Sequence, residues 1–136
     1  MVKESDMTQR KRILLVDDDY DFVEATSAVL ESVCDVDVAY GGNEGMARAR
    51  AQKPDLILLD VIMPDEDGFA VCEKLKADPA LADVPVMMLT SLTNGLSVTK
   101  PVHGSPQADG YLEKPIKPME LLRRVAKFLT AGAQAR

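Results

Sequence analysis

The sequence predicts an α/β fold in which a parallel five-stranded sheet is covered by helices on both faces. Short apolar runs recur along the chain, and most are followed by a segment with helical spacing, as in repeated strand–helix units. The run at residues 56–59 is apolar at four consecutive positions, which is typical of a central strand buried on both faces. Because parallel strands joined by helices require right-handed crossovers, a doubly wound sheet is expected.

Strands and helices alternate within one domain, which we place at residues 11–130 of the 136. Residues 1–10 are polar and are predicted to be a flexible tail, and residues 131–136 a C-terminal tail or linker. The apolar spacing predicts strands at residues 13–16, 36–38, 56–59, 85–89 and 110–113, and helices at residues 22–33, 44–52, 69–77 and from 118 onward.

The segment between the fourth and fifth strands interrupts this alternation. A fourth helix is required there by the pattern, but Gly95, Pro101, Gly104 and Pro106 all oppose helix formation. We therefore predict that residues 92–109 form a mostly irregular connection in place of a regular helix. Long irregular connections in compact domains are commonly functional.

Composition and charge exclude several classes of protein. The net charge of −6 should repel nucleic acid and anionic lipid, so we expect neither nucleic acid nor a membrane among the partners. The chain has no signal-peptide pattern and no apolar run of membrane-spanning length, which predicts a cytoplasmic protein. Cys34 and Cys72 lack metal-ligand spacing and are predicted to be reduced packing residues.

Polar residues stand where the predicted strands end. Asp17 and Asp18 follow the first strand, Asp60 the third, Thr90 the fourth and Lys114 the fifth. Because the carboxyl ends of parallel strands meet at one edge of a sheet, these side chains should converge. Crowded carboxylates require a cation, and oxygen ligands suit Mg²⁺ or Mn²⁺. With a lysine and a hydroxyl nearby, the cluster predicts a phosphoryl site whose acceptor is a carboxylate.

Each of these residues also has an ordinary structural explanation. Asp18 could cap a helix, Thr90 could simply end a strand, and Lys114 could be a solvated lysine. The joint pattern at four strand ends favours a site over these separate explanations. His103 is interpreted as a loop residue, and not as a phosphodonor or metal ligand, because the chain has no second histidine.

Four motifs in order resemble those of the response-regulator receiver family, and the match covers residues 11–129. They are Val16-Asp17-Asp18, the stretch 59–64 with Asp67-Gly68, the stretch 89–91, and the stretch 111–115. The resemblance implies a flavodoxin-like strand order of 2-1-3-4-5. It also implies that Asp60 accepts a phosphoryl group from a phosphohistidine of a sensor histidine kinase or phosphotransfer protein, or from a small acyl phosphate.

The resemblance further implies a role for each residue around Asp60. Mg²⁺ would be bound directly by Asp18, Asp60 and the backbone carbonyl of Ile62, and by Asp17 through water. Lys114 would hold a phosphoryl oxygen, and the Lys114–Pro115 peptide would be cis. Thr90 would move toward the phosphoryl group and Tyr111 would move inward with it, which makes the domain a two-state switch.

The function expected from this resemblance is that of a phosphorylated signalling domain and not of an enzyme acting on outside substrates. The domain would catalyse its own phosphorylation and slow dephosphorylation. Because no output domain follows Arg136, we expect a stand-alone receiver that contacts an unidentified protein target, as a monomer or a phosphorylation-dependent dimer.

Three alternatives compete with this reading. The first is an interaction scaffold of the same fold that works independently of phosphorylation, which the irregular segment favours and the complete acidic set disfavours. The second is a flavin mononucleotide carrier, disfavoured because the aspartates after the first strand would repel the phosphate of the flavin. The third is a hydrolase, for which no separate general base is visible.

Overall fold

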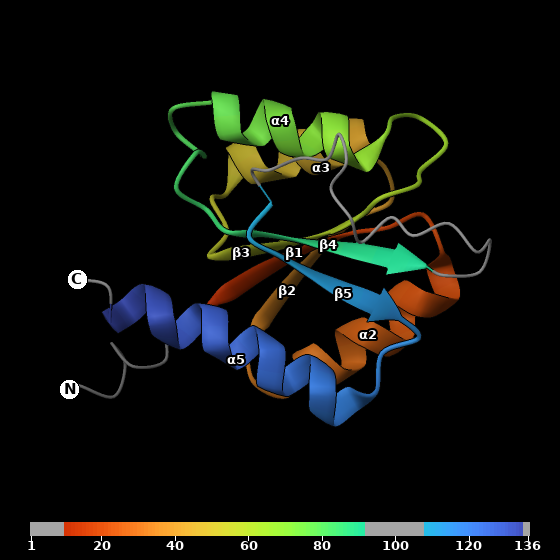
Figure 1. The fold of residues 1–136 in the computed structure, drawn as a ribbon, viewed down its shortest axis with the longest axis vertical. Coiled ribbons are helices and arrows are strands. Elements are labelled where there is room, and N and C mark those ends of the chain that lie inside the picture. The colour runs from red at the N-terminus through yellow and green to blue at the C-terminus, as the bar shows by residue number, and fades with distance from the viewer. Residues whose placement is uncertain (1–9, 92–107, 135–136) are drawn as a thin grey trace.

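In the part of the chain that the structure describes, a five-stranded parallel sheet carries two helices on each face (Figure 1). The computed structural model describes residues 10–91 and 108–134. The strands pair in the order β2-β1-β3-β4-β5, which confirms the predicted doubly wound sheet. The strands are β1 (Arg12–Val16), β2 (Asp35–Ala39), β3 (Leu56–Asp60), β4 (Val86–Ser91) and β5 (Gly110–Lys114). The four helices of the described residues are α2 (Tyr20–Leu30), α3 (Gly42–Ala51), α4 (Gly68–Ala77) and α5 (Pro118–Gln134).

The sheet separates two hydrophobic clusters. In Figure 1, α3 and α4 cover one face of the sheet, and α2 and α5 cover the other. Successive residues of β3 alternate between the clusters: Ile57 and Leu59 pack on the α3/α4 side, whereas Leu56 and Leu58 pack on the α2/α5 side. A strand buried on both faces needs an apolar residue at every position, which explains the uninterrupted run that identifies β3 in the sequence.

Aspartate side chains determine where three of the helices begin. Asp19 accepts a hydrogen bond from the backbone N–H of Phe22 at the start of α2, and Asp67 caps α4 in the same way. The start of α3 has no side-chain cap of its own at Gly41. Instead, Asp65 from the loop after β3 accepts hydrogen bonds from the backbone N–H groups of Gly42 and Asn43. These bonds satisfy donors that a helix leaves unpaired, so α3 begins before residue 44, its predicted start.

The described residues at the two ends of the domain differ from the predicted tails. Arg10 forms an ion pair with Asp35 at 3.0 Å and donates hydrogen bonds to the backbone carbonyls of Glu31 and Cys34. The helix α5 continues to Gln134, past residue 130, where the predicted domain ends. Arg10 therefore makes contacts with the domain, and α5 extends beyond residue 130, while the predicted domain bounds stay a prediction.

Several expectations concern residues outside the described ranges. These residues include 1–9 of the predicted tail, His103 and most of the segment predicted to be irregular. Within that segment only residues 108 and 109 are described, and they lie in neither helix nor strand. Cys34 and Cys72 are buried and neither is in a disulfide, as predicted. None of the helices in residues 10–91 and 108–134 has the length and apolar character needed to cross a bilayer.

Candidate functional site

The predicted site residues converge at the carboxyl edge of the sheet. Asp60 is the last residue of β3, Lys114 the last of β5, and Thr90 lies in β4 beside them, while Asp17 directly follows β1. Asp17 and Thr90 are fully buried and Asp60 is 8% exposed, whereas Asp18 faces solvent. The edge therefore holds a buried polar cluster with one exposed carboxylate at its margin.

Lys114 supplies the positive charge of this cluster. Its Nζ lies 2.7 Å from Oδ2 of Asp17 and 3.6 Å from Oδ1 of Asp60. The same ammonium lies over the aromatic ring of Phe22, 4.4 Å from the ring centroid. Residue 22 begins a predicted helix in the sequence, but helical spacing does not show which distant residue a side chain meets.

Asp17, Asp18 and Asp60 could together hold a metal ion. Each offers a carboxylate oxygen, and these oxygens all lie within 4.8 Å of one another. Oδ1 of Asp17 accepts a hydrogen bond from the backbone N–H of Asp19, but Oδ2 is buried without a hydrogen bond among the described residues. Its contact with Lys114 is an ion pair that lacks hydrogen-bond geometry. Among the described residues, three carboxylates lie together and one ammonium pairs with two of them, which leaves negative charge in excess, so the donor set fits a hard divalent cation.

The environment of Asp60 raises the pKa of its carboxyl to about 7. Burial is the main cause, and the nearby charge of Asp17 adds to it, with a smaller contribution from Asp18. Lys114 and a hydrogen bond from the backbone N–H of Ile62 act in the opposite direction. Without a further positive charge, the ionised form of Asp60 is therefore held at a free-energy cost.

The loop after Asp60 folds back against the end of β3. The N–H of Gly68 donates to the carbonyl of Val61 at 2.8 Å, and a Cβ on Gly68 would lie 2.1 Å from the carbonyl oxygen of Asp60. Such a distance to a backbone atom cannot be accommodated without movement of the strand end, so the position requires glycine. Ile62, in this loop, donates its N–H to Asp60 while its side chain is 62% exposed. The predicted role of its carbonyl as a metal ligand stays a prediction.

Thr90 and Tyr111 lie on adjacent strands behind the acidic cluster. The hydroxyl of Thr90 donates to the backbone carbonyl of Leu112 at 3.4 Å. The ring of Tyr111 packs against the α3/α4-side cluster, and its buried hydroxyl has no hydrogen-bond partner among the described residues. Burial raises the pKa of the Tyr111 phenol. The predicted movement of the two side chains remains a prediction, while the predicted cis peptide at Lys114–Pro115 is confirmed.

Comparison with known proteins identifies similar chains. A model of the response regulator receiver domain matches residues 13–126. The DNA-binding dual master transcriptional regulator RpaA of Synechocystis sp. is 42% identical over 120 residues, which are 87% of this chain and 48% of that protein. The DNA-binding response regulator MtrA of Mycobacterium tuberculosis is 40% identical over 119 residues, 87% of this chain and 50% of that protein.

A solved structure shows the same arrangement of elements. The chemotaxis protein CheY4 of Vibrio cholerae superposes with a TM-score of 0.79 at 29% identity, over 88% of this chain and 99% of that one. In contrast, this chain spans about half the length of the curated relatives RpaA and MtrA. The similarity to those relatives therefore concerns one part of each protein.

One prediction about partners is wrong. The expected partners excluded nucleic acid, but relatives with this kind of domain are DNA-binding regulators. The physical reason is that the net charge of −6 is summed over these 136 residues only. It does not determine what a protein containing such a segment binds elsewhere along its length.

The geometry and the comparisons agree on the family. The sheet has the strand order that the resemblance implies. The motifs of the sequence contain the acidic residues at the ends of β1 and β3 and Lys114 at the end of β5. The family model covers residues 13–126, which include all of these residues. The chain belongs to the response-regulator receiver domain family of two-component systems.

Proposed function

We propose that the domain is phosphorylated at Asp60 in a Mg²⁺-dependent reaction. The observation that carries this proposal is the position of the Asp60 carboxylate. Its side chain is 11% exposed, and its oxygens lie 3.6 Å from the Lys114 ammonium and within 4.8 Å of oxygens of two further carboxylates. The donor would be the phosphohistidine of a sensor histidine kinase or of a phosphotransfer protein, or a small acyl phosphate. The relatives named as response regulators support this assignment.

The transfer would exchange one bond to phosphorus for another. An oxygen of Asp60 attacks phosphorus and forms a P–O bond, the P–N bond to the donor imidazole breaks, and the imidazole takes up a proton from water. Lys114 would then pair with a phosphoryl oxygen, because its ammonium already lies close to the acceptor. Positioning and charge neutralisation account for most of the catalysis of such transfers.

The cation would occupy the cluster of carboxylates. Asp18, Asp60 and the carbonyl of Ile62 would hold it directly and Asp17 through water. When bound, Mg²⁺ would neutralise the carboxylates and the oxygens of the incoming phosphoryl group. The buried Oδ2 of Asp17, which has no hydrogen-bond partner among the described residues, supports this placement.

Phosphorylation would act as a switch. The new charge at Asp60 would favour a conformation in which Thr90 turns toward the phosphoryl group and Tyr111 follows, and this conformation would alter contacts with other proteins. The domain would catalyse its own phosphorylation and a slow hydrolysis, without acting on outside substrates. A cytoplasmic location stays a prediction.

Intact mass measurement tests the proposal. The protein is incubated with Mg²⁺ and acetyl phosphate, and separately with phosphohistidine donors. We expect the wild type to gain one phosphoryl group, and Asp60→Asn or added EDTA to abolish the gain. Asp67→Asn is the matched control, because Asp67 caps α4 outside the cluster, and it should be phosphorylated like the wild type. A wild type that gains no mass from any donor would instead favour the phosphorylation-independent scaffold.

A further inference from the structure

The aromatic ring of Phe22 is a third contact of the Lys114 ammonium besides its two carboxylates. The Nζ of Lys114 lies 4.4 Å from the centroid of the ring. Phe22 stands in the first turn of α2 and is partly buried against the α2/α5-side cluster. An ammonium over the face of an aromatic ring is attracted by the negative charge of the π system, and the attraction grows when water is excluded. The side chain of Lys114 is only 18% exposed, so part of that water is excluded here.

A closed series of contacts holds this ring in place. Asp17 Oδ1 accepts from the N–H of Asp19 at 3.0 Å, and Asp19 Oδ1 accepts from the N–H of Phe22 at 3.1 Å. The ring of Phe22 then meets Lys114, whose Nζ lies 2.7 Å from Oδ2 of the same Asp17. The series begins and ends at one buried carboxylate. The position of the ring is therefore tied to the position of the acidic cluster.

Lys114 needs such a constraint because its two carboxylates do not fix the ammonium at Asp60. Its Nζ lies nearer to Asp17, at 2.7 Å, than to Asp60, at 3.6 Å. A lysine side chain is a point charge on a flexible stem with several rotatable bonds, so ion pairs alone leave its direction loose. The face of Phe22 limits the remaining freedom of the ammonium. Contact with the ring thereby limits how far the ammonium can move away from the two carboxylates.

We propose that Phe22 is a positioning residue of this site, which holds the Lys114 ammonium beside Asp17 and within reach of the phosphoryl acceptor Asp60. The inference rests on the proposed phosphorylation of Asp60 for its functional meaning. Phe22 would act through Lys114, since its own side chain has no group that could contact a phosphoryl oxygen by hydrogen bonding or charge. Loss of the ring should therefore slow transfer without abolishing it.

A spectroscopic measurement tests the contact itself, without any phosphoryl donor. Protons that lie over the face of an aromatic ring resonate upfield, so in protein with ¹³C-labelled lysine we expect one ε-methylene signal shifted upfield. Lys114→Arg assigns that signal by removing it. Phe22→Tyr should retain the shift, because the ring remains, and Phe22→Leu should lose it. If the wild type shows no shifted lysine signal, the contact does not exist in solution and the inference is overturned.

A kinetic measurement tests the consequence for phosphorylation. With acetyl phosphate and saturating Mg²⁺, we expect Phe22→Leu to be phosphorylated about fivefold more slowly than the wild type. Phe22→Tyr should restore most of the rate. The matched control is Phe128→Leu, which removes a partly buried phenylalanine from the same cluster, next to Gly110 at the other end of β5, and should retain the wild-type rate.

The outcomes separate this inference from the proposed function. Equal rates for Phe22→Leu and wild type, or equal slowing by Phe22→Leu and Phe128→Leu, would overturn the positioning role, since the second result would reflect lost packing only. A wild type that accepts no phosphoryl group would overturn the proposed function instead. The lysine spectrum would then still decide whether Phe22 holds Lys114.

Discussion

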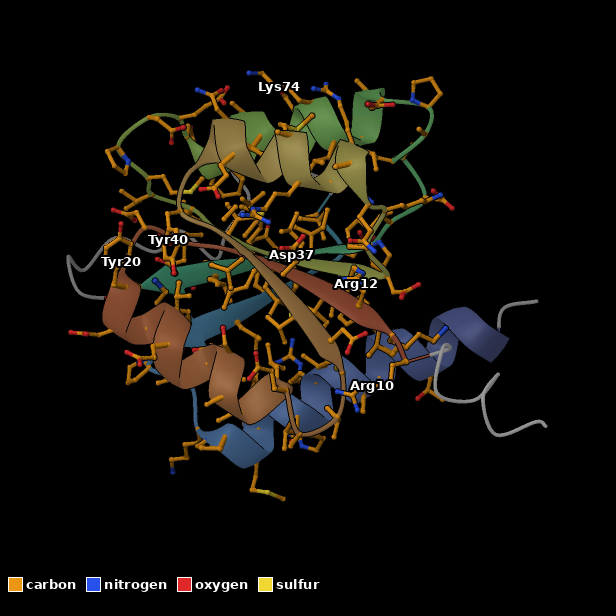
Figure 2. The ribbon with its side chains drawn as sticks, turned by 180° about the vertical axis from the view of Figure 1, so that it is seen from behind. Arg10, Arg12, Tyr20, Asp37, Tyr40 and Lys74 are labelled. Carbon is orange, nitrogen blue, oxygen red and sulfur yellow. The ribbon has the colours of Figure 1, made fainter. Side chains whose placement is uncertain are left out.

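The two edges of the sheet differ in how well their carboxylates are paired with donors. At the amino edge, each of two carboxylates meets donors: Asp109 accepts from the N–H of Val86 and from Lys76, and Asp55 accepts from the N–H of Arg12. At the carboxyl edge, the Lys114 ammonium lies near two carboxylates of a group of three, and an oxygen of Asp17 has no hydrogen bond among the described residues. Figure 2 shows how far apart the edges lie, with Arg10 and Arg12 at one end and Tyr20 and Tyr40 at the other.

This contrast separates carboxylates whose charge is balanced by nearby donors from carboxylates whose charge the described residues leave in excess. A satisfied carboxylate lowers the free energy of the folded chain, whereas a buried carboxylate short of positive charge raises it. The amino edge therefore stabilises the domain on its own. Among the described residues, the carboxyl edge keeps an excess of negative charge, and the following predictions test that difference.

The largest effect should be a pH dependence that comes from Asp60. Its folded-state pKa is raised to about 7, so between about pH 4 and pH 7 the folded chain holds a proton that the unfolded chain has lost. The free energy of unfolding should therefore fall as the pH rises through this range and then level off, by roughly 2–4 kcal/mol from this group.

Urea denaturation of the wild type and of Asp60→Asn, at pH 5 and pH 8 with EDTA present, measures this contribution. Asp60→Asn should lack this fall and be the more stable protein at pH 8. Saturating Mg²⁺ should stabilise the wild type at pH 8 more than the variant. An identical pH dependence in both proteins would mean that the carboxyl edge carries no such unbalanced charge.

The next largest effect should come from Gly68→Ala. The added Cβ would lie 2.1 Å from the carbonyl oxygen of Asp60 and 2.8 Å from the Cα of Val61, both backbone atoms. We expect a loss of about 1–3 kcal/mol of stability and slower phosphorylation, because the end of β3 must shift.

Gly110→Ala, at the amino edge, is the matched control for this substitution. Its Cβ would meet side-chain atoms of Phe128 at 3.1 Å, and these can move aside. Thermal denaturation and the rate of phosphorylation by acetyl phosphate are measured for both variants. If Gly110→Ala slowed phosphorylation as much as Gly68→Ala did, the prediction that only the carboxyl edge affects phosphorylation would be wrong.

The smallest effects should come from two lysines at the amino edge, and Lys76→Met should be the larger of the two. The ammonium of Lys76 donates to the carbonyl of Val84 and to Asp109, with the side chain 15% exposed, so its loss should cost about 1 kcal/mol. The rate of phosphorylation should not change. Lys53→Met, which breaks an exposed pair with Asp83, should have a smaller effect on the urea midpoint. Slower phosphorylation in Lys76→Met would show that the edges are not independent.

The sequence predicts the sheet and the acidic cluster because both depend on local patterns. A strand buried on both faces must be apolar throughout, as at residues 56–59, and a strand that ends at a site ends in polar residues such as Asp60. Parallel topology then brings the strand ends together without further information. The fold class and the convergence of these residues follow from such signals alone.

Other features depend on contacts between distant residues, which local patterns do not contain. The start of α3 is determined by Asp65, which arrives from the loop after β3. Helical spacing turns Phe22 toward the core, but only the assembled fold shows that Lys114 lies over its ring. The hydrogen bond from the N–H of Ile62 to Asp60 likewise depends on the path of a loop. The start of a helix and the immediate neighbours of the site therefore required the structure.

The unequal surroundings of the three tyrosines give the domain an optical reporter of its own. The chain contains no tryptophan, so tyrosine dominates its near-ultraviolet absorption. Tyr20 and Tyr40 are 67% and 41% exposed and stack edge to face, whereas the hydroxyl of Tyr111 is buried and the pKa of its phenol is raised by burial. An alkaline absorbance titration should therefore show one phenol that ionises late. Following that transition before and after phosphorylation would reveal the state of β5 without any added label.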